Sequence, residues 1–222
     1  MRRTIFLLSL LLVFSLAPLA RADEDVHSLM VKIQEKYGRL DAASASYTRD
    51  VITRSMSMMG MKTSGDLAKG KLFFQFPLSI RMEQETPHHE TLLSDGAVLL
   101  WYVPDKKTLY KYPADKFGKE LSVLRDLFRG LEKAEKRFHI DLMEPAEGNA
   151  FRLKLTPTPP WEQVDYLVVL LSRGVNIKGL EIHNILGSIT RFTIEGLKAA
   201  GPFKKNFFKL QVPDDTKIIQ EN

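Results

Sequence analysis

The sequence predicts a mainly β protein with helices (α+β), built on a single strongly curved antiparallel sheet that forms an incomplete barrel. Segments in which apolar and polar residues alternate recur along most of the chain, and they correspond to about ten to twelve half-buried strands. Only two segments have a clear helical period. One of them interrupts the strands, where it can cover the concave side of the sheet as a lid over an apolar cavity.

The start of the chain has the three parts of a cleavable secretory signal. Two arginines precede an apolar run, Ile5 to Leu16, and the segment ends on Ala20-Arg21-Ala22. The apolar run is too short for a comfortable membrane span. We therefore expect residues 1–22 to be removed on export to the periplasm, and residues 23–222 to form one domain. The chain has no cysteine, so we expect no N-terminal lipid anchor.

The composition argues against nucleic acid as a partner. The formal net charge is +5, from 32 Lys and Arg against 27 Asp and Glu. Three of the basic residues lie in the signal segment, so the remainder has 29 basic and 27 acidic residues, a net charge of +2. Proteins that bind phosphate backbones normally have a larger basic excess. Nothing after Leu19 is long and apolar enough to span a bilayer, so we expect a soluble protein, taken to be a monomer.

Residues 25–40 have the spacing of an amphipathic helix, with Asp25 or Asp23 available as its N-cap. Its apolar positions are Val26, Leu29, Met30, Ile33, Tyr37 and Leu40.

Strands are predicted after Asp41. Apolar residues alternate with polar ones on either side of Pro77, and Asp95-Gly96 has the composition of a hairpin turn. Pro104-Asp105 marks a second turn, which precedes a strand at 108–112.

The second predicted helix covers residues 115–131, with Asp115 as a plausible cap and Gly130 near its end. Its apolar positions include Phe117, Leu121, Leu124 and Phe128. Strands are then predicted again, at about 137–143, 149–156, 164–171, 175–185, 188–196 and 205–212.

The order of these parts resembles the periplasmic outer-membrane lipoprotein carrier (LolA-like) family over nearly all of the chain after the signal. The N-terminal helix is followed by Ser44-Ala-Ser-Tyr-Thr48, and Phe76-Pro77 leads to Ile80-Arg-Met82. Leu93-Ser-Asp-Gly96 then runs into Leu100-Trp-Tyr102, and the Gly187 turn and the ending at Phe207–Pro213 continue the match.

The resemblance implies an incomplete barrel, lidded by helices, that holds the acyl chains of a lipoprotein in transit between two membranes. It also implies an inner-membrane donor complex and an outer-membrane acceptor as partners. The family often has a basic residue at the position of Phe76, which helps to hold the lid shut.

The alternation of residues suggests which side chains line the cavity. The expected lid residues are Phe117, Leu121, Leu124 and Phe128, although the same helix can be read as an immobile core helix. The expected walls are Leu72, Phe74, Ile80, Met82, Leu92, Leu100, Tyr102, Phe151, Leu153 and Ile182.

A methionine-rich loop between Arg54 and Lys62 is the most unusual local feature. Its methionines are Met56, Met58, Met59 and Met61. Flexible thioethers suit a surface that accepts an irregular apolar partner or cargo. The alternative is that they only pack on a neighbouring strand.

The sequence gives little support for catalysis, and we expect no catalytic residue, metal site or cofactor. It has no G-x-S-x-G, Gly-rich phosphate loop or H-E-x-x-H motif. His88 and His89 are adjacent, so in a strand they point to opposite faces. The function predicted from the sequence is therefore a periplasmic carrier of lipoprotein or lipid. A sensor domain of the same architecture is the alternative, and a hydrolase of an apolar substrate is a weaker one.

Overall fold

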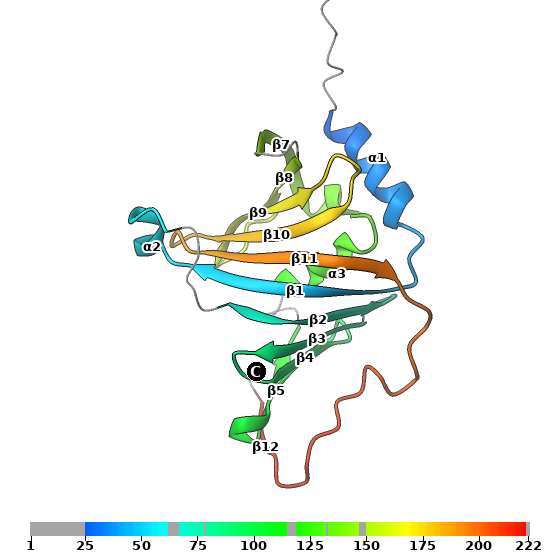
Figure 1. The fold of residues 1–222 in the computed structure, drawn as a ribbon, viewed down its shortest axis with the longest axis vertical. Coiled ribbons are helices and arrows are strands. Elements are labelled where there is room, and N and C mark those ends of the chain that lie inside the picture. The colour runs from blue at the N-terminus through cyan, green and yellow to red at the C-terminus, as the bar shows by residue number, and fades with distance from the viewer. Residues whose placement is uncertain are drawn as a thin grey trace, which may run out of the picture.

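The computed structural model describes residues 25–61, 67–77, 79–114, 119–131, 133–146 and 150–220. The expected signal segment and the expected lid residue Phe117 lie outside these residues. Within them the chain forms one twelve-stranded sheet, in the order β12-β6-β5-β4-β3-β2-β1-β11-β10-β9-β8-β7 (Figure 1). Its two edge strands, β7 and β12, do not pair with each other, so the sheet is an open half-barrel.

The strands of the first half run from the middle of the sheet to one edge. They are β1 (Ala42–Ile52), β2 (Ala68–Gln75), β3 (Ser79–Thr86), β4 (Glu90–Ser94), β5 (Val98–Val103) and β6 (Thr108–Pro113). The strands on the other side of β1 are β11 (Ile189–Ala199), β10 (Ile177–Asn184), β9 (Val164–Leu171), β8 (Ala150–Pro157) and β7 (Phe138–Ala146). Neighbouring strands are antiparallel, except that β12 (Lys217–Gln220) runs parallel to β6.

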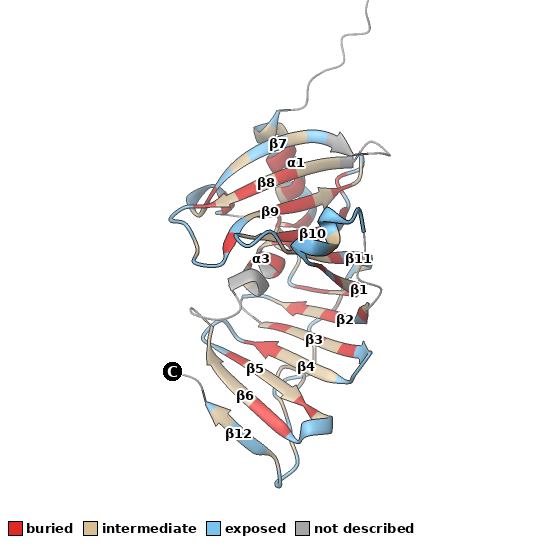
Figure 2. Ribbon diagram, turned by 90° about the vertical axis from the view of Figure 1, so that its left-hand side faces the viewer, coloured by how far each residue is buried: buried red, intermediate tan, exposed pale blue. Residues whose placement is uncertain are grey.

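β-Bulges help to bend the sheet. The pairing of β1 with β11 shifts register between Ser44 and Ser46, and that of β2 with β3 shifts between Lys69 and Gly70. A Cβ atom on Gly70 would lie 1.9 Å from the carbonyl oxygen of Glu83, so only glycine permits this close approach. Because a bulge increases local twist and bends its strand, the sheet curves around the helices (Figure 2).

Helix α1 (Val26–Tyr37) confirms the first predicted helix and its cap. The carboxylate of Asp25 accepts a hydrogen bond of 2.6 Å from the backbone N–H of Ser28. The buried side of the helix packs on the inside of the curved sheet, and the hydroxyl of Tyr37 accepts a hydrogen bond of 3.1 Å from the N–H of Ile177 on β10. The buried residues of α1 are Leu29, Met30, Ile33 and Tyr37.

Helix α3 (Lys119–Leu127) is the helix predicted to interrupt the strands, and turns continue it to Leu131. A 3-10 turn, η2 (Ala134–Lys136), then leads into β7. In Figure 1, α3 lies behind β1 and β11. The face of the sheet that packs against α1 and α3 is called the inner face below, and the opposite face is called the outer face.

The predicted strand at 205–212 is wrong. This segment consists of turns and extended coil, and the last strand is β12 instead. The rings of Phe203 and Phe207 pack on Phe73 of the outer face, with centroids 5.8 and 5.0 Å from its own. Arg81 donates a 2.9 Å hydrogen bond to the carbonyl oxygen of Phe207. The apolar residues of this segment are thus partly buried by packing across strands rather than by strand pairing.

Two short helices occupy predicted turns or loops. The turn at Pro104 forms the 3-10 helix η1 (Pro104–Lys106), as expected. The methionine-rich loop begins with a short helix, α2 (Arg54–Met58), capped by the side chain of Thr53. No helix among the described residues is long and apolar enough to cross a membrane.

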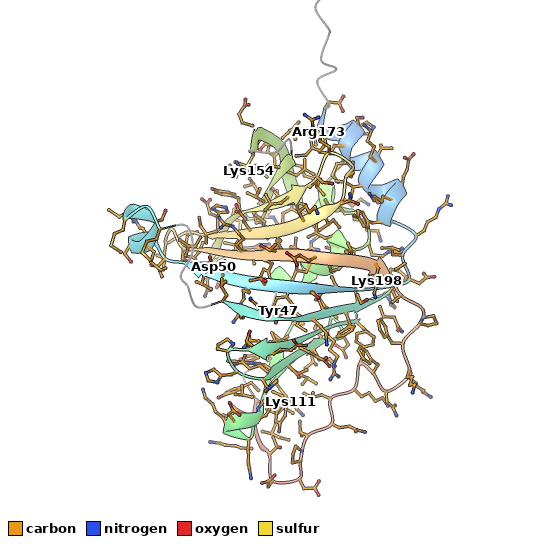
Figure 3. All side chains as sticks on the ribbon, in the orientation of Figure 1. Tyr47, Asp50, Lys111, Lys154, Arg173 and Lys198 are labelled. Atoms are coloured by element: carbon orange, nitrogen blue, oxygen red, sulfur yellow. The ribbon has the colours of Figure 1, made fainter. Side chains whose placement is uncertain are left out.

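The outer face of β1 and of β8 to β11 is polar. Strands there carry charged residues such as Asp50 and Lys154 (Figure 3). At its centre, the carboxylate of Glu181 is buried and accepts a 2.8 Å hydrogen bond from Nε of Arg191. Nε2 of His183 lies 3.2 Å from the same carboxylate.

Candidate functional site

The inner face of the sheet is a continuous apolar wall. Cross-strand pairing places Ala45, Leu72, Met82 and Leu92 in one row across β1 to β4. Residues directly opposite one another in an antiparallel pair share a face, so the whole row points inward. The wall is therefore an apolar surface, and any apolar group can pack against it.

Most of the expected wall residues come together on this face. Leu92 and Phe151 are partly buried and pack against the core. The others belong to the buried core cluster itself: Leu72, Phe74, Ile80, Met82, Leu153 and Ile182.

Leu100 and Tyr102 lie on the outer face, contrary to the expectation from alternation. Leu92 on β4 pairs with Trp101 on β5, so Leu100 pairs with Leu93, and Tyr102 with Thr91. The side-chain period of a strand is two, and a register one residue away reverses the faces of all its residues. In a strand as uniformly apolar as Val98–Val103, the sequence does not reveal which set points inward.

Three aromatic residues extend the inner face toward the β12 edge. Trp101 stacks on Tyr110 with ring centroids 5.0 Å apart, and Tyr110 stacks on Tyr112 with centroids 6.3 Å apart. All three are half-buried, and the indole N–H of Trp101 donates a 3.0 Å hydrogen bond to Glu90. Tyr110 and Tyr112 lie two positions apart in the chain, and this spacing indicates that both rings lie on one face of a strand. Neither tyrosine was assigned a role from the sequence.

Helix α3 closes the wall. Leu124 and Phe128, two of the expected lid residues, are fully buried, as are Val123 and Leu127. The ring of Phe128 lies over Phe74 of β2, with centroids 6.0 Å apart. Leu121 belongs to α3, but its side chain lies outside the described part of the chain. In this structure α3 therefore occupies the inner face.

The end of α3 is fastened to its surroundings by polar and backbone contacts. The guanidinium of Arg129 lies over the ring of Phe76 and donates a 3.3 Å hydrogen bond to the carbonyl oxygen of Leu40. Gly130, at φ +69°, approaches α1 so closely that a Cβ atom would lie 2.8 Å from the carbonyl oxygen of Ile33. The helix therefore has a defined docking position.

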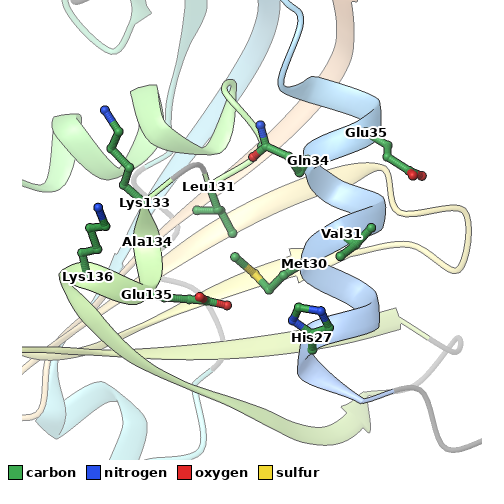
Figure 4. Close-up of a pocket in the computed structure, with 11 residues that line it drawn as sticks. His27, Met30, Val31, Gln34, Glu35, Leu131, Lys133, Ala134, Glu135 and Lys136 are labelled. Carbon is green, nitrogen blue, oxygen red and sulfur yellow. The ribbon is translucent and has the colours of Figure 1, made fainter.

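A pocket of about 380 Å³ lies between α1 and the segment that follows α3 (Figure 4). Its floor includes the buried side chains of Met30, Leu131 and Ala134. Its lining also carries charges of both signs, including Glu35 and Lys133. The pocket lies at the edge of the inner face and marks the gap between the two covering helices.

The inner wall shields its polar side chains from water. Tyr47, on the inner face of β1, shows this: burial is the main reason that the pKa of its phenol rises to about 12. Among the described residues there is no group of three or more His, Cys, Asp or Glu side chains that could hold a metal ion. The side chain of His88 makes an exposed pair with Asp105, at 3.6 Å.

The expected methionine contact surface lies apart from the inner wall. Met58, Met59 and Met61 are exposed, and Met56 is partly exposed. They belong to α2 and the turn after it, which project from the end of the sheet in Figure 1. The structure does not bring these side chains together with the wall residues.

Comparison with known proteins gives consistent matches. The sequence model of a family described as "Outer membrane lipoprotein carrier protein LolA" matches residues 57–211. An outer-membrane lipoprotein carrier protein of Pseudomonas entomophila is 25% identical over 204 residues, covering 91% of both chains. Its counterpart in Francisella philomiragia is 23% identical over 188 residues, covering 84% of this chain and 85% of its own.

A solved structure supports the fold alone. An uncharacterized conserved protein from Thermus thermophilus superposes with a TM-score of 0.53 at 9% identity. The match covers 86% of this chain and 97% of that one.

Proposed function

Because the chain belongs to the outer membrane lipoprotein carrier family, we propose that it binds the acyl chains of a lipoprotein, or of another lipid, on its inner face. The proposal includes export to the periplasm with removal of residues 1–22, leaving one domain, and transfer of cargo from the inner to the outer membrane. The observation that carries it is that an apolar helix, rather than a further strand, covers the wall.

The chemistry of the cover supports an exchange of α3 for acyl chains. The buried side of α3 consists of aliphatic and aromatic side chains, including Leu124, Leu127 and Phe128. An acyl chain offers the wall the same kind of contact. The cargo can therefore take the place of the helix, and the buried polar groups of the wall keep their hydrogen-bond partners.

Rough magnitudes favour a reversible exchange. Exposing three large apolar side chains of α3 costs about 5–9 kcal/mol, at about 1.5–3 kcal/mol each. Shielding an acyl chain of about fifteen methylenes gains on the order of 12 kcal/mol, at about 0.8 kcal/mol each. The free energy gained by shielding two or three acyl chains therefore exceeds the cost of exposing the apolar side chains of α3. The return of α3 to the wall then favours release to an acceptor that binds the cargo more tightly.

The proposal also specifies partners. The sequence has no Gly-rich phosphate loop, so we assign the energy for loading to an inner-membrane donor complex. Delivery is assigned to an outer-membrane acceptor. The wall and its cover come from one chain, so a monomer suffices for cargo binding.

The test compares two Leu→Ala variants that lose similar core packing. Leu124 is buried on α3, whereas Leu93 is buried on the outer face of β4. Each substitution should lower the free energy of unfolding by about 2–4 kcal/mol. If α3 is a lid, Leu124→Ala also raises the open fraction, and the apparent affinity for a fluorescent tripalmitoylated lipopeptide should rise about tenfold or more. Leu93→Ala should leave that affinity unchanged.

Fluorescence polarisation with the lipopeptide, and urea unfolding of each variant, provide the two readouts. The carrier proposal fails if neither the wild type nor Leu124→Ala binds the lipopeptide. Release of free fatty acid from the probe would instead indicate a hydrolase. Equal affinities for the wild type and both variants would make α3 an immobile core helix.

A further inference from the structure

Exposed apolar side chains are concentrated at one end of the sheet. Met58 is 79% exposed and Met59 is 70% exposed, while Ile185 and Leu186 are 60% and 75% exposed. Met61, with a smaller exposed fraction, belongs to the same group. Such residues are common singly on protein surfaces, but a contiguous group of them marks an interaction site.

The two segments that carry these residues are adjacent in space. Ile52, just before α2, pairs with Ile189, just after the β10–β11 turn. A Cβ atom on Gly187 in that turn would lie 3.2 Å from the side chain of Arg54 on α2. Figures 1 and 2 both show α2 beside the β10–β11 turn. We call residues 53–61 together with residues 184–189 the apolar tip.

Both segments of the apolar tip are built so that their apolar residues point outward. The side-chain oxygen of Thr53 accepts a hydrogen bond of 3.3 Å from the N–H of Met56 and caps α2. The side-chain oxygen of Asn184 accepts a 2.7 Å hydrogen bond from the N–H of Leu186. Gly187 provides the positive φ that closes the turn. The N–H groups of Met56 and Leu186 are thus bonded within the tip, that of Ile185 bonds the carbonyl oxygen of Gln163, and the aliphatic side chains are left for a partner.

The charge around the apolar tip is complementary to an anionic lipid surface. Residues 51–61 and 184–191 contain no Asp or Glu, although the chain has 27 acidic residues. Their charged side chains are Arg54 and Arg191, and Arg191 is paired with the buried carboxylate of Glu181, so Arg54 is the cation that the tip presents. Cationic side chains beside membrane-inserted aliphatic ones are attracted to anionic headgroups.

The shape of the apolar tip also favours a bilayer over a second copy of the chain. The tip consists of two protruding turns, which need a matching hollow in a protein partner. The pocket between α1 and η2 has charged residues of both signs in its lining, including Glu135 and Lys136. A fluid bilayer accepts protruding aliphatic side chains without a preformed socket.

We propose that the apolar tip inserts into the surface of an anionic bilayer, through Met58, Met59, Ile185 and Leu186. The inner face of the sheet is a separate surface, so this docking does not depend on cargo binding. A carrier docked by its tip would be held beside the membrane with which it exchanges cargo. The proposal assigns the methionines to membrane contact rather than to cargo contact.

The test uses the exported protein and vesicles of phosphatidylethanolamine with phosphatidylglycerol, without any membrane protein. The wild type should co-sediment with these vesicles, and less with vesicles of phosphatidylcholine alone. Replacing the four residues by serine should lower the partition coefficient by roughly two to four orders of magnitude, because each half-inserted side chain contributes about a factor of three to ten. The matched control is Ile218→Ser, since Ile218 is 54% exposed on β12, far from the apolar tip. It should bind as the wild type does.

A second readout uses the absence of cysteine from the chain. An environment-sensitive NBD label on Leu186→Cys should shift to shorter wavelength and gain intensity when these vesicles are added. The same label on Ile218→Cys should not. Circular dichroism of every variant verifies that the fold is retained.

Three outcomes would overturn the membrane proposal. The first is a wild type that does not bind protein-free vesicles, and the second is an unchanged partition coefficient in the four-residue variant. The third is a dimer in sedimentation velocity that the four serines dissociate, which would assign the apolar tip to a second copy of the chain. Lipopeptide binding is measured in the same samples without vesicles, so failure of the cargo proposal is detected separately.

Discussion

The guanidinium carbon of Arg129 lies 3.9 Å from the centre of the Phe76 ring. The same guanidinium donates a hydrogen bond to the carbonyl oxygen of Leu40, between α1 and β1. Arg129 follows α3, whereas Phe76 follows β2, so the contact joins the end of α3 to the sheet and to the α1–β1 connection. The resemblance to the carrier family suggested a basic residue at position 76 as part of the latch. Here the cation comes from the segment after α3 and its partner ring from the segment after β2.

Replacing Arg129 by glutamine should loosen the lid. A cation–π contact contributes about 0.5–2 kcal/mol, depending on how far it is desolvated. Its loss weakens the closed state by roughly 1 kcal/mol, so the apparent affinity for a tripalmitoylated lipopeptide should rise about fivefold. Fluorescence polarisation of a labelled lipopeptide measures this change.

Arg81→Gln is the matched control for this latch. Arg81 lies over the ring of Phe207 at 5.2 Å and donates to its carbonyl oxygen, but on the outer face. Its loss should reduce stability without changing the affinity for the lipopeptide. Equal effects of the two substitutions on affinity would show that Arg129 does not act as a latch.

Gly130 offers a second way to disturb the closed lid. Its backbone is in the left-handed region, and an added Cβ atom would meet the backbone of Ile33 and Gln34, at 2.8 Å in each case. Gly130→Ala should therefore strain the backbone by about 1 kcal/mol and also push the end of α3 away from α1. Hydrogen exchange of the amides of Val123 to Leu131 should become faster.

Gly196→Ala separates these two effects. Gly196 has a similar φ of +62°, but nothing lies within 4 Å of its added Cβ atom. The variant should share the backbone strain and leave exchange in α3 unchanged. If Gly196→Ala accelerates exchange in α3 as much as Gly130→Ala does, the contact with α1 is not what holds the lid.

Glu181 should make stability depend on pH in the acid range. Burial alone would raise the pKa of its carboxyl, but hydrogen bonds from His183 and Arg191, with the charge of Arg191, lower it to about 2 from the usual 4.5. A depressed pKa stabilises the folded state above the unfolded-state pKa, and this contribution is lost as pH falls from about 4.5 toward 2. Its magnitude is on the order of 3–4 kcal/mol, at about 1.4 kcal/mol per pKa unit.

Urea unfolding at neutral pH and at about pH 3 tests this dependence. Glu181→Gln should be less stable than the wild type at neutral pH, and its stability should fall less between the two conditions. Glu195→Gln, which changes an exposed carboxylate on β11, serves as the control and should behave as the wild type does. A Glu181→Gln variant that loses as much stability in acid as the wild type would contradict the assignment.

Local patterns in the sequence predicted the helices and most strands, because each depends on residues close together in the chain. The spacing of Leu29 and Ile33 predicted the buried side of α1, and the Asp95-Gly96 turn predicted the β4–β5 hairpin. Leu72 and Phe74 were placed on the correct face for the same reason. Lys71 and Gln75 are polar residues that alternate with the apolar residues at 72, 74 and 76, so they indicate which face of the strand is exposed.

Long-range pairing was beyond these patterns. The parallel pairing of β12 with β6 joins segments about a hundred residues apart, with no local signal for it. Phe207 belongs to a segment that resembles a strand, yet this segment is a coil that crosses the outer face and packs the Phe207 ring on Phe73. The register of β5 was ambiguous because its residues are aliphatic or aromatic on both faces. Local alternation shows that residues are buried, but it does not identify what buries them.

The corrected face of β5 leads to the last prediction, which uses the two tryptophans of the chain. Trp101 lies on the inner face, in the row that contains Leu72 and Met82, and its ring is half-buried. Trp161 packs against Phe138 on β7, toward the opposite edge of the same face, with ring centroids 5.7 Å apart. A lipid chain bound on the inner face should therefore come into contact with Trp101.

A fatty acid with a nitroxide on its acyl chain quenches tryptophan only at short range, so it can report this contact. In the Trp161→Phe variant, where Trp101 is the remaining tryptophan, the nitroxide lipid should quench most of the fluorescence at saturation. In the Trp101→Phe variant, the signal of Trp161 should be quenched much less. If the two variants are quenched equally, or only Trp161 responds, the lipid does not bind along the row that Trp101 shares with Leu72. Phe74→Glu should abolish the quenching of Trp101 without transferring it to Trp161, because a buried carboxylate disfavours an apolar chain beside it. That loss would show that the inner face is needed for binding.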